Sequence, residues 1–226
     1  MSGAYYAGPN PPGAAELRVL GALIEKRRTT PDAYPLSVNS LRLACNQSTN
    51  RDPVVDYDER TILDALEHLG RRGWTRLASG AGSRARKYRH LFDEALSLGD
   101  GEIALLAVLM LRGAQTPGEL KQRTERLHPF GDLTALEAAL DGLIDRELVR
   151  RLERRPGQKE QRYVQLLDGG ESTEPAAQAE SAATFAAPVA SPGADPGAEL
   201  DRLDRLERDL AHLKDEVARL RDLLGG

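Results

Sequence analysis

The stretch from 61 to 92 changes its hydrophobic period partway along. In its first part, apolar residues recur at helical spacing with charged residues between them: Ile62, Leu66 and Leu69. From Trp74 onward the pattern indicates an extended segment, a glycine-containing tip at 80–83 and a returning strand at 87–92. A helix followed by a glycine-tipped basic hairpin is typical of the end of a winged-helix domain.

The same pattern occurs a second time. Three leucines match the first set at a constant offset: Leu136, Leu140 and Leu143. A strand, a tip and a return are predicted at 148–152, 154–159 and 162–164, and the earlier apolar stretches at 16–28 and 102–112 also correspond. A repeat of this length indicates a duplicated domain, because solenoid repeats are shorter.

Helix-start signals divide each copy into elements. Ser37 is the expected N-cap of a helix at 38–45. The run at 116–119 combines a threonine cap, a proline in the first turn and a capping-box glutamate. The expected starts of the third helices are Tyr57 or Asp58, and Asp132 or Thr134.

The C-terminal part has a different pattern. Residues 169–197 are dominated by Ala, Ser, Pro, Gly and Glu, a composition that cannot bury a core and predicts a flexible linker. From 199 to 224 apolar residues alternate in steps of three and four, which predicts a coiled coil about three heptads long. The residues of its oligomerisation seam are Leu203, Leu206, Leu210, Leu213, Val217, Leu220 and Leu224.

We therefore expect a mainly α-helical fold with small β-wings. The predicted order is a disordered start at 1–13, winged-helix domains at 14–95 and 100–168, the linker at 169–197 and the coiled coil at 199–224.

Charge is distributed unevenly along the chain. The net charge is −4, but residues 1–168 hold 25 Lys or Arg against 23 Asp or Glu, whereas residues 169–226 hold 6 against 12. The two predicted domains are therefore close to neutral, and the acidity belongs to the tail.

Several kinds of site and location are disfavoured by composition. Cys45 is the only cysteine, so no internal disulfide or cysteine metal cluster is expected, and the four histidines show no ligand spacing. We expect no metal, no cofactor and no catalytic constellation, hence no enzyme. No apolar run is long enough to cross a bilayer, and the first 13 residues lack the pattern of a signal peptide, so we expect a cytoplasmic protein without a membrane partner.

Five motifs resemble the YceH family of bacterial proteins. They are LIEK at 23–26, TTP at 29–31, YPLS followed by Asn39 at 34–39, ACNQ with Asn50, Arg51, Pro53 and Val54 at 44–54, and LRGAQTPGEL at 111–120. The resemblance covers roughly residues 14–168. It implies two tandem winged-helix domains, in agreement with the internal repeat, and implies little about activity.

The first predicted wing carries the strongest functional signal. Between Arg71 and His90 the basic residues are not interrupted by a carboxylate. Such a run can contact the phosphates of duplex DNA, although arginines on a hairpin also protect an edge strand from aggregation. The candidate DNA-binding residues are Arg71, Arg72, Arg76, Arg84, Arg86, Lys87 and Arg89.

The acidic residues of the predicted third helices disfavour recognition of DNA bases by these helices. Asp58, Glu59, Asp64 and Glu67 precede the basic end of the first of these helices, and carboxylates repel phosphates. Any DNA binding is therefore expected to come mainly from the wing, with weak sequence preference. The alternative is a protein-interaction scaffold that uses the winged-helix faces without DNA.

The polar loop after the second helix is a second candidate site. Asn46, Gln47, Asn50 and Arg51 could bind a ligand or a partner protein, or they could satisfy the backbone of their own loop. Cys45 is expected to be a buried small hydrophobe rather than a nucleophile.

The coiled-coil pattern predicts a parallel homodimer. With Leu203 at position a, the facing g and e residues of two parallel chains carry opposite charges: Arg202 with Glu207, Asp209 with Lys214, and Glu216 with Arg221. In sedimentation at tens of micromolar, the full chain should be dimeric and a chain ending at Gly170 monomeric. Equal monomeric masses would refute the dimer, and a cysteine at Leu203 that fails to cross-link to its own copy would refute the parallel orientation.

Overall fold

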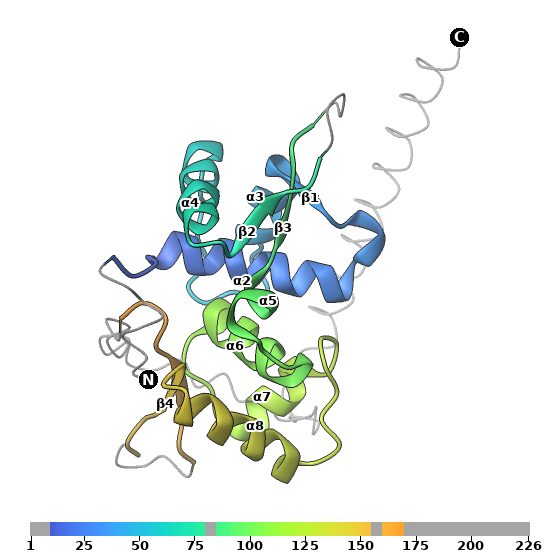
Figure 1. The fold of residues 1–226 in the computed structure, drawn as a ribbon. Helices are drawn as coiled ribbons and strands as arrows, with labels where there is room; N and C mark the ends of the chain where they lie inside the picture. The colour runs from blue at the N-terminus through green and yellow to red at the C-terminus, as the bar shows by residue number, and fades with distance from the viewer. Residues whose placement is uncertain (1–9, 80–84, 155–159, 170–226) are drawn as a thin grey trace, which may run out of the picture. The chain divides into compact units, whose positions relative to one another are not determined.

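The computed structural model describes residues 10–79, 85–154 and 160–169, and its first compact unit spans residues 1–176. The predicted start of the chain up to residue 9, nearly all of the predicted linker, the coiled coil and Arg84 lie outside the described residues. The described part is mainly helical with small antiparallel sheets (Figure 1).

The first half of the unit holds three main helices and a three-stranded sheet. Its elements, in order, are α2 (Ala14–Thr29), the 3-10 turn η1 (Pro31–Ala33), β1 (Leu36–Ser37), α3 (Val38–Cys45), α4 (Glu59–Arg71), β2 (Thr75–Leu77), β3 (Lys87–His90) and α5 (Phe92–Leu96). The strands lie in the order β1-β3-β2, and both pairs are antiparallel.

The second half repeats this order. Its elements are α6 (Asp100–Arg112), α7 (Pro117–Thr124), α8 (Leu133–Asp145), β4 (Val149–Arg151) and β5 (Tyr163–Gln165). Strands β4 and β5 form an antiparallel pair, and a single bridge from Gln115 to Tyr163 occurs where the first half has β1. The domain boundary predicted between 95 and 100 falls at the junction of α5 and α6, and it stays a prediction.

The helix starts follow the predicted capping chemistry. The side chains of Ser37, Asp58 and Asp132 accept hydrogen bonds from backbone N–H groups in the first turns of α3, α4 and α8, at 3.2, 2.8 and 2.8 Å. Thr116 and Glu119 form the predicted capping box of α7.

Three expectations about local structure were wrong. Phe92 does not continue the return strand, because strand pairing ends with the bond from Leu91 N to Trp74 O (2.8 Å) and Phe92 opens α5. The sequence after the start signal at 116–119 predicts a helix that ends near Leu127, but α7 ends at Thr124, whose Oγ1 donates a hydrogen bond back to Leu120 O. Val54, in the polar loop after α3, is expected from its apolar side chain to pack on the core, but it is 59% exposed.

Trp74 is buried at the point where α4 gives way to the hairpin. It is 4% exposed, and its ring meets that of Phe92 edge-on, with centroids 4.9 Å apart. This contact fixes the start of the hairpin to α5.

Helices α2 and α6 form the centre of one continuous core. Every residue from Leu17 to Ile24 of α2 and from Ile103 to Leu111 of α6 is buried, as expected for helix segments covered on all sides. They lie side by side (Figure 1), and α2 packs on α6 at Gly21. A Cβ atom at Gly21 would lie 2.9 Å from Leu111 Cγ, so only glycine allows this approach.

Replacing Gly21 by alanine should weaken the packing of α2 on α6. Gly142, inside α8, is the matched control, because a Cβ there would meet nothing closer than Glu102 Oε1 at 3.8 Å. Both changes gain about 1 kcal/mol of helix propensity, whereas overpacking at Gly21 costs about 1–3 kcal/mol. Urea unfolding should therefore find Gly21→Ala less stable than Gly142→Ala by about 1–3 kcal/mol. Equal stabilities would show that the two helices are not closely packed.

Candidate nucleic-acid interface

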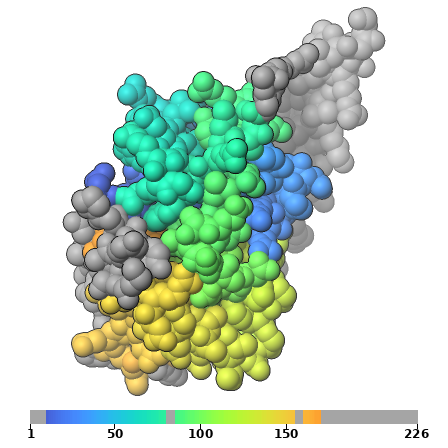
Figure 2. All heavy atoms as spheres, in the orientation of Figure 1, coloured from blue at the N-terminus to red at the C-terminus, as the bar shows by residue number. Residues whose placement is uncertain are grey.

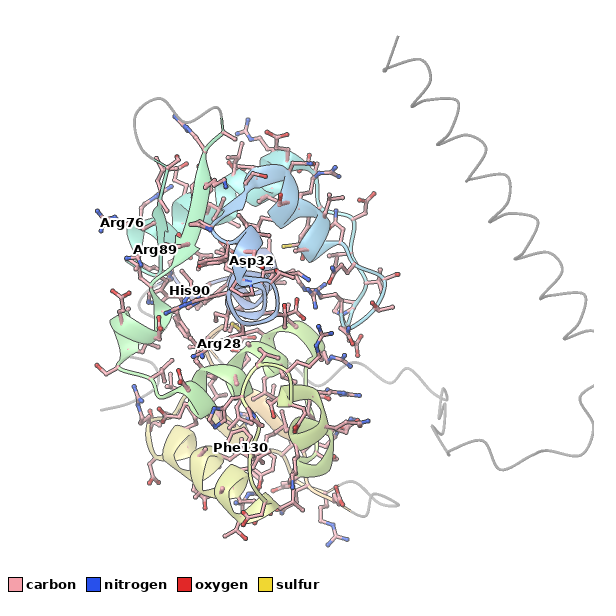
Figure 3. All side chains as sticks on the ribbon, turned by 90° about the vertical axis from the view of Figure 1, so that its right-hand side faces the viewer. Arg28, Asp32, Arg76, Arg89, His90 and Phe130 are labelled. Carbon is pink, nitrogen blue, oxygen red and sulfur yellow. The ribbon has the colours of Figure 1, made fainter. Side chains whose placement is uncertain are left out.

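The first hairpin places basic side chains on one face. Arg76 and Arg89 are direct partners across β2 and β3, and Lys87 lies two residues from Arg89 on the same face. Figure 3 shows Arg76 and Arg89 on the outer side of the hairpin. Like charges directly opposite each other in a sheet are destabilising, and the weak pair of Arg89 with Glu94 at 3.9 Å relieves this only in part. We call Arg76, Lys87 and Arg89 the basic face.

The opposite face of the hairpin is fixed to α2. His90 is 2% exposed, and its Nε2 accepts a hydrogen bond from Arg27 at 3.4 Å. Burial lowers the pKa of His90 to about 4, with the charges of Arg27, Arg28 and Arg89 adding to the effect against that of Asp93, so the ring is neutral at pH 7. The strand that carries Lys87 and Arg89 is therefore fixed to α2 through the buried side chain of His90.

Tyr34 also binds strand β3, through the backbone of His90. Its hydroxyl oxygen accepts a hydrogen bond from the backbone N–H of His90 at 2.7 Å. Burial raises the pKa of Tyr34 to about 12, so the hydroxyl stays protonated and its oxygen remains an acceptor.

The other predicted wing residues are placed differently. Arg71 bonds to Glu67 at 2.8 Å, and the guanidinium of Arg72 lies 5.4 Å from the centre of the Trp74 ring. Arg86 is exposed just before β3, and Arg84 lies outside the described residues. The structure thus brings Arg76, Lys87 and Arg89 together, while Arg71 and Arg72 are engaged at the end of α4.

Helix α4 presents an acidic surface beside the hairpin. Figure 2 shows atoms of α4 (teal) and of the hairpin (green) next to each other on one face of the first half. Arg60 pairs with Asp64 at 3.3 Å and Arg71 pairs with Glu67, so the positive charges of these two arginines are largely neutralised within the helix. Hydrogen bonds from Thr61 hold the pKa of the capping Asp58 below its ordinary value, so this carboxylate is charged at pH 7.

Two arginines of the second hairpin, Arg151 and Arg162, have carboxylate partners. The guanidinium of Arg151 lies over the ring of Tyr163, 5.5 Å from its centre, and bonds to Asp141 at 3.3 Å. Arg162 bonds to Glu119 at 3.1 Å. The second hairpin is therefore the weaker candidate for phosphate contact.

The polar loop after α3 makes its bonds within the chain. The side-chain amide of Asn46 donates to Tyr57 O and accepts from Tyr57 N, both at 2.9 Å. Gln47 accepts from Arg51 at 3.0 Å, and Asn50 accepts from Arg112 of the second half. Three of these side chains therefore shape the loop and tie it to its neighbours.

Arg51 is the buried centre of this loop. It is 6% exposed and bonds to both carboxylate oxygens of Glu25, at 3.1 and 2.6 Å, and to Ala44 O at 2.9 Å. Burial acts to raise the pKa of Glu25, but the bonds and charge of Arg51 outweigh it and hold the pKa below its ordinary value. Cys45 is buried nearby, as expected, and burial raises the pKa of its thiol to about 12.

Sequence reasoning missed two buried polar groups, Arg18 and His90. Arg18 is 4% exposed, and the available signal was its position inside the apolar run of the first helix. His90 gave no such signal, because its partners Arg27 and Tyr34 are far away in the sequence.

Two kinds of feature are absent from the described residues. None of the described helices is long and apolar enough to cross a membrane. Within the same residues, no group of three or more His, Cys, Asp or Glu side chains is arranged to hold a metal ion.

Comparison with known proteins identifies relatives over most of the chain. A UPF0502 protein from Pelobacter propionicus is 46% identical over 211 residues, covering 91% of each chain. One from Solibacter usitatus is 46% identical over 205 residues, or 89% of this chain and 92% of its own. One from Geotalea daltonii is 52% identical over 169 residues, or 74% and 75%.

A family model described as "Protein of unknown function, DUF480" matches residues 13–158. The UPF0502 relatives are the YceH-like proteins that the sequence motifs indicated, so that resemblance is confirmed. The chain therefore belongs to the DUF480 family, together with these UPF0502 proteins.

Proposed function

We propose that this protein is a cytoplasmic, transcription-regulator-like protein that binds duplex DNA mainly through the basic face of its first hairpin. The observation that carries the proposal is the Arg76–Arg89 pair, two like charges placed directly opposite each other, with Lys87 beside them. Such an arrangement loses free energy in isolation and gains it when a phosphate backbone approaches.

The order of elements supports tandem winged-helix domains. Each half has a first helix, a short extended contact, two further helices and an antiparallel hairpin. In helix-turn-helix proteins the last helix of such a set enters the major groove and the flanking segments contact the backbone. The hairpin of the first half would then be its wing.

The acidic surface of α4 supports weak sequence preference. Glu59, Asp64 and Glu67 are exposed, and two of the three pair with arginines of the same helix. Carboxylates in the major groove would meet the repulsion of both phosphate strands. The proposed contact is therefore with the backbone, which positions the protein without reading bases.

A scaffold that binds another protein is the second candidate. It is favoured by large apolar side chains at the surface, Leu43 on α3 at 57% exposure and Val54 at 59%. In either role the protein would act by binding rather than by catalysis. The predicted coiled coil at 199–224 would pair two copies and double the contacts available to one partner.

The DNA proposal is tested by neutralising the basic face. Fluorescence anisotropy with a labelled duplex should show weak binding that falls with salt. The triple variant Arg76→Gln, Lys87→Gln, Arg89→Gln should bind less well, and its slope of log affinity against log salt should be shallower by about 2–3, because each phosphate contact contributes about 0.9.

The matched control removes the same charge from the second half, through Lys121→Gln, Arg126→Gln and Arg150→Gln. It should keep most of the binding and of the slope. Equal losses in the two triple variants would show that net charge alone matters and would refute the assignment to the basic face. A parent protein that does not bind duplex DNA even at low salt would refute the proposal and favour the scaffold.

A further inference from the structure

A cavity of about 880 Å³ lies between the first and second halves. Its walls come from the beginning of α2, the loop at 50–53, the end of α6, helix α7 and the second hairpin. This volume is in the range of sites that enclose small molecules. Asn50 and Arg51 of the predicted ligand loop line it, whereas Asn46 and Gln47 are not among its lining residues.

Positive side chains outnumber negative ones in the lining. The arginines are Arg18, Arg51, Arg112, Arg123 and Arg162, and the carboxylates are Asp52, Glu119 and Asp168. Of the arginines, Arg51 is neutralised by Glu25 from behind the wall. The others decide what the cavity can bind.

Among the described residues, the guanidinium groups of Arg18 and Arg112 hydrogen-bond to neutral oxygens and form no close ion pair. Arg18 donates to two carbonyl oxygens, of Cys45 at 3.1 Å and of Pro53 at 2.7 Å, and Arg112 donates to the amide oxygen of Asn50. Carbonyl and amide oxygens satisfy the N–H groups but do not cancel the charge. Neutral acceptors thus hold both guanidinium groups, and the carboxylates of Asp52 and Glu119 act on Arg18 and Arg112 only at longer range.

Glu119 has more than one basic partner. It bonds to Arg162 at 3.1 Å and pairs with Arg123 at 3.4 Å, and it also accepts from the backbone of Thr116. Burial lowers the pKa of the neighbouring Arg112, and the charges of Arg123 and Arg51 lower it further. In this part of the wall the single carboxylate of Glu119 therefore lies near three guanidinium groups, those of Arg112, Arg123 and Arg162.

The wall also holds polar atoms without partners. Nε of Arg18, Nε of Arg162 and Oε1 of Gln115 have no hydrogen-bond partner in the described part of the chain. Arg18 and Gln115 are each 4% exposed. Unpaired polar atoms on buried side chains are unusual and often mark a place where a water, an ion or a ligand completes the structure.

The remaining lining is apolar. It includes Leu17, Leu109, Met110, Leu152 and Val164. Small-molecule sites commonly combine apolar walls with a few polar groups that orient the ligand. A fitting ligand would join an anionic group to a less polar body.

We propose that this cavity binds a small organic anion, whose phosphate or carboxylate group is held by Arg112, Arg123 and Arg162. The guanidinium fork matches both oxyanions, and three of them around one carboxylate leave an excess of donors and of positive charge. The ligand would touch Arg18 of α2 as well as the second half, and would stabilise the junction between them. This site does not depend on DNA binding, since a duplex cannot enter a cavity of this size.

Titration calorimetry and thermal unfolding of the full chain test the site, with three probes: inorganic phosphate, a nucleoside monophosphate and a dicarboxylate. At least one probe should give saturable heat and raise Tm. Preference for the monophosphate over the dicarboxylate identifies a phosphate ligand, and the reverse identifies a carboxylate ligand. Absence of saturable heat with all three probes overturns the proposal.

Variants locate the binding. Arg112→Gln and Arg162→Gln should each weaken binding by about tenfold or more, because each loses a charged hydrogen bond. Arg150→Gln is the control, as an exposed arginine of the same hairpin that is not among the lining residues. Arg112→Lys keeps the charge without the fork, and should retain the unliganded Tm while binding less tightly than the parent. Equal affinities of the parent, Arg112→Lys and Arg150→Gln overturn the assignment.

Discussion

The close packing of α2 against α6 joins the two halves of the described structure around one core. Gly21 lets the two helices approach until a methyl group would meet Leu111 and Met110, and the apolar residues on either side form one core with both halves. Packing at this density fixes positions to fractions of an ångström. The β2–β3 hairpin, anchored through Trp74 and Phe92, is therefore placed relative to the same core as the second half.

Polar bonds at both ends of this contact set its orientation. At one end, Arg28 of α2 pairs with Asp100 of α6. At the other, the backbone N–H of Asp52 donates to Leu111 O at 2.9 Å, and Arg112 donates to Asn50. Exposed ion pairs contribute little stability, but directional bonds at two ends restrict rotation of one helix on the other. Arg112 and Arg51 line the cavity at this junction, so the packing of the two halves also shapes the candidate anion site.

The sequence predicted most elements of the fold because their signals are local. Caps such as Ser37 and Asp132, and the period of Ile62, Leu66 and Leu69, need no knowledge of distant partners. Phe92 was misassigned because one apolar residue fits a strand or a helix equally well.

The candidate sites also differ in how far a local sequence signal reveals them. The basic run from Arg71 to Arg89 is readable from composition, whereas the register that sets Arg76 opposite Arg89 needs the hairpin. The burial of Arg51 depends on Glu25 in α2, and the cavity depends on residues from both halves, so neither is visible from local pattern. The sequence therefore locates the first basic surface and leaves the tertiary sites to the structure.

Native-state hydrogen exchange tests the shared core most directly. The backbone amides of Leu20 in α2, Leu66 in α4, Leu105 in α6 and Leu140 in α8 are all buried in that core. If the α2–α6 contact unites the two halves, one cooperative unfolding reaction should expose all four amides to exchange. Their free energies of opening should then be equal and should depend on denaturant in the same way. Two groups, with α6 and α8 opening at a clearly different free energy from α2 and α4, would contradict a shared core.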